Sequence, residues 1–265
     1  MTDNKIWLIV GAVVAAFAVG AGLYYWTSGD EAVPEQVAEA PPAEISPPQE
    51  VEPEGGAIML PPLAESDEAV RRLVAALSSN PQFASWLVTD DLVRRFVVAV
   101  ENVAEGSNPS QRLPFLKPNE RLGTVGADVE LRIDPASYAR YNRTAAIVES
   151  VDAAGSAELY HTIRPLIDEA YRELGHPEGG FDATLERAIR HLLETPIVER
   201  LDPRLVPRSI FLEYADEDLE SLTPIQKQLL AMGPDNVRIV QAKLRELAAA
   251  LGIPADRIPT PVVLR

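Results

Sequence analysis

The sequence predicts a mostly α-helical protein with three parts: a transmembrane helix, a disordered acidic and proline-rich tether, and a compact helical domain. Three observations favour this fold class. Residues 6–26 form an uncharged apolar run, residues 27–64 are rich in glutamate and proline, and much of the remaining chain repeats apolar residues at intervals of three and four. We expect about six to eight helices in the domain and at most a short strand pair.

The apolar run has the length of a membrane-spanning helix. It covers 21 residues, from Ile6 to Trp26, and as a helix it spans roughly 31 Å, about one hydrocarbon core. Aromatic rings lie near both ends, where the headgroup level favours them. A cleaved signal peptide is the alternative, but its apolar region is about 7–15 residues long and is followed by small residues. Here the run is longer, and the bulky residues Tyr24, Tyr25 and Trp26 stand where a cleavage site needs small residues, so we expect an uncleaved anchor.

The charges that flank this run predict its orientation. Lys5 precedes it, whereas the next basic residue is Arg71. The positive-inside rule therefore places residues 1–5 in the cytoplasm and the chain after residue 26 on the other side of the membrane. The chain contains no cysteine, which excludes disulfides and thiol chemistry and is compatible with an oxidising compartment.

Residues 27–64 predict a flexible spacer. The segment carries glutamates and prolines and no basic residue, so it cannot bury enough apolar surface to offset the entropy of ordering. Fully extended it reaches about 120 Å. A proline-rich docking motif is the alternative. The whole chain has a formal net charge of −16, which argues against a nucleic-acid partner, since such a protein needs a basic face.

The domain of residues 65–253 begins with two amphipathic helices. Ser66 is expected to cap the first and Thr89 the second, with a short helix between them after Asn80. The strings DEAVRRLVAAL and DDLVRRFVVAV resemble each other at an offset of 23 residues. We interpret them as one amphipathic pattern used twice. The expected apolar positions are Val70, Leu73, Val74, Leu77, Phe83, Trp86, Leu87, Leu92, Val93, Phe96, Val97 and Val100.

The remaining elements follow the same reasoning. Residues 106–134 lack helical periodicity, and the alternation in VELRID predicts a short strand at 129–134. The later helices are expected at 135–151, at 157–175 with a kink at Pro165, at 181–195 with Asp182 as cap, at 216–232 and at 234–252. Gly155 and Ser156 are expected to separate the first two of these. Residues 254–265 are expected to form a C-terminal tail.

One helical face contains titratable residues. His161, Arg164 and Asp168 lie at helical spacing, with Arg172 one turn further on. Such a face serves either an acid–base group or, more commonly, a solvated helix surface with intrahelical pairs. No HExxH, GxSxG, P-loop or Rossmann pattern occurs. The sequence therefore predicts no catalytic residue, no metal site and no cofactor, although paired carboxylates remain an alternative.

The candidate contact residues are arginines and tyrosines. Arg71, Arg72, Arg94 and Arg95 are candidates for a contact surface, because arginine pairs with carboxylates and phosphates in a fixed geometry, although helix-surface ion pairs are the simpler reading. Tyr138 and Tyr141, and also Tyr160 and Tyr171, are expected either to pack in the core with the hydroxyl on a polar partner or to line a groove between the helices at 135–151 and 156–174.

Several strings taken in order are similar to one bacterial family. They are LPPLAESDEAVR, LVRRFVVAVEN, YARYN, PLIDEAYRELG, FDATLERAIRHLLETP and PIQKQLLAMGPDNV. Their combination resembles the "domain of unknown function 3014" family over about residues 58–253. The resemblance implies a single-pass inner-membrane protein with a variable tether. The family carries no assigned activity, so no residue role can be transferred.

The function we expect is that of a non-catalytic binding or scaffolding protein of the bacterial cell envelope. It would be anchored in the inner membrane through residues 6–26, with its domain in the periplasm and an envelope protein as its partner. Two alternatives stay open. One is an envelope glycan or peptide hydrolase or lyase that uses carboxylates, and the other is a regulator that acts on a membrane partner through the anchor helix.

Overall fold

The computed structural model describes residues 60–109, 122–127, 131–178, 180–199, 203–208 and 211–265. The predicted cytoplasmic segment 1–5, the predicted anchor at 6–26 and residues 27–59 of the predicted tether lie outside this range. Among the described helices, none combines the length and the apolar character that crossing a membrane requires.

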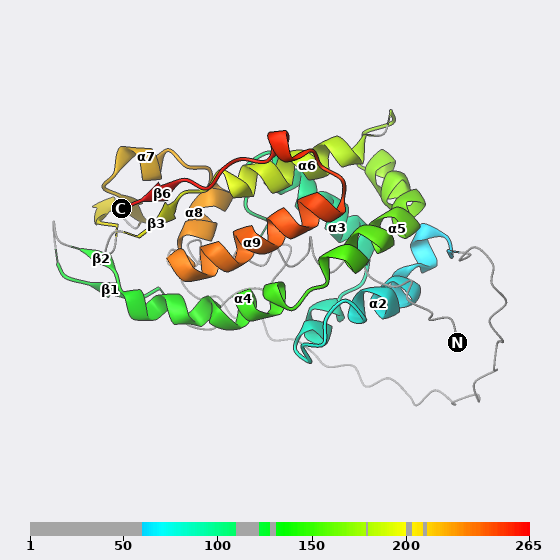
Figure 1. The fold of residues 1–265 in the computed structure, drawn as a ribbon, viewed down its shortest axis with the longest axis horizontal. Coiled ribbons are helices and arrows are strands. Elements are labelled where there is room, and N and C mark those ends of the chain that lie inside the picture. Colours follow the sequence, from blue (N-terminus) through cyan, green and yellow to red (C-terminus); the bar gives the residue numbers. More distant parts are fainter. Residues whose placement is uncertain (1–59, 110–121, 128–130, 179, 200–202, 209–210) are drawn as a thin grey trace, which may run out of the picture.

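Helices dominate the described part of the chain, as the periodicity predicted. Figure 1 shows α9 in the middle of the domain and α5 toward the end where α2 lies, and α9 packs against α4, α5, α6 and α8. Eight α-helices are described: α2 (Asp67–Ala75), α3 (Leu92–Ala104), α4 (Asn142–Glu149), α5 (Ala153–Glu173), α6 (Phe181–Leu193), α7 (Glu217–Glu220), α8 (Pro224–Leu230) and α9 (Pro234–Ala250). Four 3₁₀ helices accompany them: η3 (Leu63–Glu65), η4 (Phe83–Leu87), η8 (Pro135–Tyr141) and η9 (Ala255–Arg257).

The described strands form three short pairs, more than the single pair expected. Strand β1 (Thr124–Val125) pairs antiparallel with β2 (Arg132–Ile133), and β4 (Leu205–Arg208) pairs antiparallel with β5 (Phe211–Tyr214). Strand β3 (Ile197–Val198) pairs in parallel with β6 (Val263–Leu264). The alternation at 129–134 correctly indicated β2. The other strands have two to four residues, and no longer run of alternating residues marked them, whereas the two residues of β2 lie within the alternation at 129–134.

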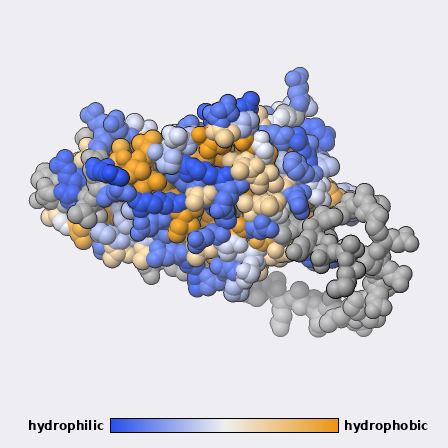
Figure 2. Space-filling view, viewed as in Figure 1, coloured by the Kyte–Doolittle hydropathy of each residue, from blue (hydrophilic) through white to orange (hydrophobic). Residues whose placement is uncertain are grey.

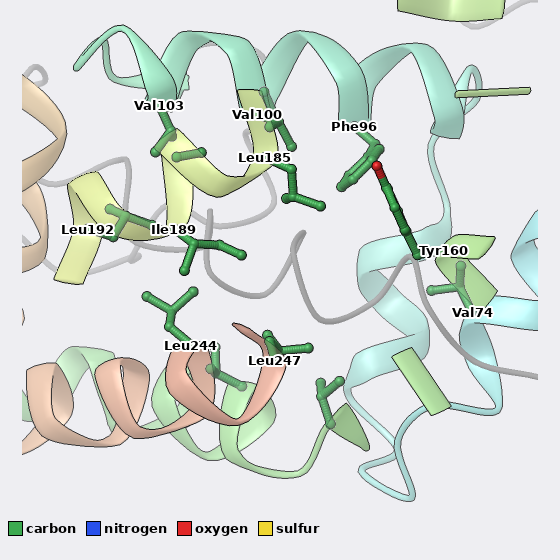
Figure 3. Close-up of a cluster of buried hydrophobic side chains, with 14 of the residues drawn as sticks. Val74, Phe96, Val100, Val103, Tyr160, Leu185, Ile189, Leu192, Leu244 and Leu247 are labelled. Atoms are coloured by element: carbon green, nitrogen blue, oxygen red, sulfur yellow. The ribbon is translucent and has the colours of Figure 1, made fainter. Parts of the chain in front are cut away.

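A large part of the main core lies on the two sides of α6, against α3 on one side and α9 on the other. Figure 3 shows side chains of α3 and α6 pointing toward one another, with α9 side chains on the other side of α6. The predicted apolar stripes of α2, η4 and α3 are buried, which confirms that hydrophobic burial determines their orientation. The labelled members of this cluster are Val74, Phe96, Val100, Val103, Tyr160, Leu185, Ile189, Leu192, Leu244 and Leu247.

Ser66 occupies the N-cap position of α2 as predicted, but its side chain does not cap the helix, and the predicted cap at Thr89 is wrong. The Ser66 hydroxyl donates backward to the carbonyl of Leu63 at 2.8 Å, because η3 runs directly into α2. Helix α3 begins at Leu92 after Asp91, whose φ is 57°. The carboxylate of Asp67, at the start of α2, accepts from the backbone N–H groups of Asp91 and Leu92 at 2.7 and 2.9 Å. One helix therefore caps the next.

The predicted break at Gly155 and Ser156 is also wrong, since both lie inside α5 and are buried. Asp152 caps this helix by accepting from the N–H of Ala154 at 3.1 Å. The helix continues through Pro165. The predicted cap of α6 is likewise replaced, because Gly180 with a φ of 97° precedes the helix. Asp182 makes tertiary contacts instead.

The ends of the domain differ from their predicted limits. Residues 216–232 form two helices, α7 and α8, because Thr223 and Gln226 make a capping box that starts a new helix at Pro224. Leu63 lies within the predicted tether, but it is 4% exposed and belongs to the main core. Residues 254–265 were assigned to a tail, and they form η9 and β6 against the domain.

Candidate binding surfaces

Arg71 holds secondary-structure elements together and does not offer a free guanidinium. It donates to the carbonyl oxygens of Leu87 at 2.7 Å and Thr89 at 3.0 Å, and it lies near the carboxylates of Glu68 and Asp90. These contacts fix α2 to the segment that leads from η4 into α3. Arg71 therefore acts within the fold.

Arg94 has a similar internal role. Its guanidinium makes two hydrogen bonds to the carboxylate of Glu173 on α5, at 2.6 and 3.1 Å, and one to Asp91 at 3.1 Å. The hydrogen bond from Arg94 lowers the pKa of Glu173, and the same pairing raises the pKa of Arg94. The bidentate geometry fixes α3 against the end of α5.

Arg72 and Arg95 remain on the surface. The side chain of Arg72 is 73% exposed and lies 4.0 Å from Glu68. Arg95 is exposed and donates to the carbonyl of Asp90 at 2.8 Å. The structure therefore divides the four predicted arginines into two internal clamps and two exposed residues, so the predicted arginine surface is reduced to Arg72 and Arg95.

Tyr141 is wrongly placed among the candidate contact residues. It is 0% exposed, and its hydroxyl accepts from the side-chain amide of Gln228 at 2.8 Å. Burial raises the pKa of Tyr141. The guanidinium carbon of Arg140 lies 4.8 Å from the centre of its ring. The alternative of core packing with a satisfied hydroxyl is correct for Tyr141, and also for Tyr160 and Tyr171.

Tyr138 lies beside a cavity of about 370 Å³ between η8, β3 and the start of α9. Its ring packs on Gly233, where the backbone has a φ of +84°. The amide of Asn236 is 5% exposed and donates to the carbonyls of Tyr138 and Met232 and to the side chain of Asn142, at 3.0–3.2 Å. Asn236 thus joins η8, α4 and α9 around the cavity. Its lining is Pro135, Tyr138, Ala139, Asn142, Val198, Glu199, Met232, Gly233, Pro234, Asp235 and Asn236.

The charges around this cavity are compensated locally. Arg238 pairs with Asp235 at 2.8 Å and also with Glu199, and Glu199 lies 3.5 Å from Arg265. The rim of the cavity is therefore close to neutral. Tyr138 was the sequence candidate here, while Asn236 and Glu199 were missed, because no local pattern relates residues 138, 199 and 236.

A second cavity, of about 240 Å³, contains the histidine that the sequence singled out. His161 lines it together with Tyr160, Asp182, Glu186 and Arg257. Arg164 pairs with Asp168 at 3.6 Å, as expected for a helix flank, and with Asp182 at 2.7 Å. The hydroxyl of Tyr160 donates to Asp182, and burial raises the pKa of Tyr160. Within the described residues no group of three His, Asp or Glu side chains is arranged to hold a metal ion.

The comparisons with known proteins give a family and no activity. The model of the family described as "Protein of unknown function (DUF3014)" matches residues 92–248, which is more than half of the chain. No curated protein and no solved structure matches the chain. The matched region extends from the start of α3 almost to the end of α9. It includes the whole lining of the cavity beside Tyr138, whereas the second cavity is also lined by residues 251–254 and Arg257, which lie beyond the matched region. The chain belongs to the DUF3014 family.

Proposed function

We propose that the chain is a non-catalytic binding or scaffolding protein of the bacterial cell envelope, anchored in the inner membrane through residues 6–26 with its domain in the periplasm. The uncharged apolar run of residues 6–26, the basic residue before it and the acidic, proline-rich segment after it support this topology. A long spacer is useful when the partner lies away from the membrane surface.

The observation that carries the binding role is the cavity beside Tyr138. It lies between η8, β3 and the start of α9, and Asn236 ties η8 and α4 to α9 beside it, so this part of its wall is fixed before a partner arrives. Next to it, β6 exposes the apolar side chain of Val263, which is 40% exposed. A recess beside exposed apolar surface is typical of a protein-binding site. The compensated charges at its rim fit a protein partner better than a polyanion.

The cavity at His161 favours the enzyme alternative. A histidine and two carboxylates, Asp182 and Glu186, lie on its walls. However, Asp182 is already bound by Tyr160 and Arg164, and Glu186 pairs with Arg257 at 3.2 Å. Both carboxylates thus have positional roles in the fold, which supports the binding function over the hydrolase or lyase. The third possibility, regulation through the anchor, depends on residues 6–26 alone.

Three experiments separate these proposals. A reporter that is active only in the periplasm, fused after Arg265, should be active, and activity of a cytoplasm-only reporter at that position would refute the topology. His161→Ala and Asp168→Ala should leave cells equal to wild type in any envelope assay in which deletion of the gene has an effect. Loss of function in a folded His161→Ala variant would favour the enzyme. Exchange of residues 6–26 for an unrelated anchor should be tolerated, and a loss of function would favour the regulator.

A further inference from the structure

Residues 259–265 lie along β3 in the manner of a bound peptide. The N–H groups of Ile197 and Glu199 donate to the carbonyls of Val262 and Leu264, both at 2.8 Å. These two bonds, two residues apart on each strand, are the pattern by which a parallel strand is added to a sheet edge. Residues 197–199, here called the β3 edge, therefore provide main-chain recognition of an extended segment.

The β3 edge also recognises side chains. Leu264 is half-buried and packs against the second core cluster, to which Val198 belongs. The next residue, Arg265, lies with its Nε 3.5 Å from the carboxylate of Glu199. In a bound segment, an apolar residue thus contacts the apolar surface beside Val198, and a basic residue directly after it lies near the carboxylate of Glu199.

The segment 259–265 is held by few contacts. Val262 and Val263 are 49% and 40% exposed, and the side chain of Arg265 is 85% exposed. Figure 2 shows hydrophobic surface in the region of β6. Besides β3, Arg245 holds this segment by donating to the carbonyl of Pro259 at 3.3 Å. When the segment leaves, Glu199 still pairs with Arg238, so its carboxylate is not left without an ionic partner.

We propose that the β3 edge is a binding site for an extended segment of a partner protein in which an apolar residue is directly followed by Arg or Lys, and that residues 259–265 occupy this site in cis. The carboxylate of Glu199 selects the basic residue by charge. The site contacts only about four residues of the segment. Such a contact is much smaller than the interface of a stable dimer, which buries roughly 1,200 Å² or more. It therefore fits a short linear segment better than a second folded copy.

Occupation in cis sets the affinity for a partner. A partner binds only the fraction of molecules whose segment 259–265 has left the β3 edge, so its apparent dissociation constant rises in proportion. Changes that release the segment should increase binding in trans. This inference rests on the proposed binding function for its biological use. The peptide assay described next does not depend on the membrane anchor or the tether. Failure of the proposed peptide site can therefore be distinguished from failure of the proposed envelope function.

The test measures binding of a labelled peptide, Pro-Thr-Pro-Val-Val-Leu-Arg, to the full chain in detergent by fluorescence anisotropy. Leu264→Asp removes the apolar anchor of the segment, and Val263→Asp adds the same charge at the exposed neighbouring position as a control. The Leu264→Asp chain should bind the peptide at least tenfold more tightly than the wild-type and Val263→Asp chains. A peptide with the Leu264→Asp change should bind at least tenfold more weakly than the unchanged peptide.

Three results would overturn the proposal. The first is equal peptide binding by the Leu264→Asp and wild-type chains, both folded by circular dichroism. The second is equal binding of the two peptides. The third is a dimer in light scattering that disappears in Leu264→Asp, since it would assign the β3 edge to a second copy.

Hydrogen exchange of the wild-type chain provides a measurement without any variant. The amides of Ile197 and Glu199 should exchange at least tenfold faster than those of Val240 and Leu244 in α9, because they open whenever the segment leaves. Equally slow exchange would show that the segment does not leave and would also overturn the proposal.

Discussion

Replacing Gly233 by alanine tests how the cavity beside Tyr138 is built. Gly233 has φ 84° and ψ 159°, a backbone region that is essentially restricted to glycine and costs other residues about 1–3 kcal/mol. A Cβ at this position would lie 2.4 Å from Cγ and 2.7 Å from Cδ2 of Tyr138, and such overpacking costs about 1–3 kcal/mol more. We expect Gly233→Ala to lower the free energy of unfolding by about 2–6 kcal/mol. Urea unfolding followed by circular dichroism measures it.

A matched control separates the backbone effect from the contact. Gly252 has a φ of +75°, but nothing lies within 4 Å of a Cβ built on it, so Gly252→Ala should cost only about 1–2 kcal/mol. Adding Tyr138→Ala to Gly233→Ala removes the two closest contacts, with Cγ and Cδ2, and leaves only the Cβ of residue 138 at 2.9 Å. The double variant should therefore be about 1–3 kcal/mol more stable than the sum of the single effects predicts. Additive effects, or equal costs for the two glycines, would refute the proposed packing of Tyr138 on Gly233.

Three further variants test single contacts by unfolding. Asp67→Ala should cost about 1 kcal/mol, because Asp67 accepts from the first N–H groups of α3, and no loss of stability would contradict this cap. Tyr141→Phe should cost about 1–3 kcal/mol, because the buried Gln228 amide loses this acceptor, and a neutral effect would contradict the hydrogen bond. Burial lowers the pKa of His191 from its ordinary value of 6.5. Its contribution to stability should therefore be present above about pH 6.5 and lost as the pH falls through the lowered pKa. His191→Gln should flatten this part of the stability–pH curve, and an unchanged slope would contradict the assignment.

The sequence predicted which faces of the helices are buried. In α9 the positions Val237, Val240, Leu244 and Leu247 are all buried, as their spacing indicated. Periodicity succeeds here because burial of one helix face is a local consequence of composition. It does not predict which residue satisfies the end of a helix when the partner comes from another element, as Asp67 does for α3.

The arginine pairs show the same limit for site residues. The two similar strings place arginines at 71–72 and 94–95, and in each pair the first residue turns inward and the second stays exposed. Neighbouring positions on a helix point about 100° apart, so the two arginines of a pair face different surroundings. The sequence named both because it does not show which carbonyls and carboxylates lie beside each face.

The cavity and the β3 edge depend on contacts between distant parts of the chain. Strand β3 pairs with β6, and Asn236 contacts Tyr138 and Asn142. The sequence around each of these residues contains no motif that marks it as part of a binding site. Their shared location arises from how α4, α9 and the short strands pack, which a single sequence does not reveal.

Photo-crosslinking in living cells tests the central claim, that one end of the domain binds an envelope protein, most directly. A photoreactive residue replaces Asp235, whose side chain is 93% exposed at the rim of the cavity, or Val88, which is 77% exposed near η4 at the other end of the domain. The proposed function predicts one recurrent protein adduct from position 235 and none from position 88. Equal capture from both positions, or no capture from position 235, would contradict it.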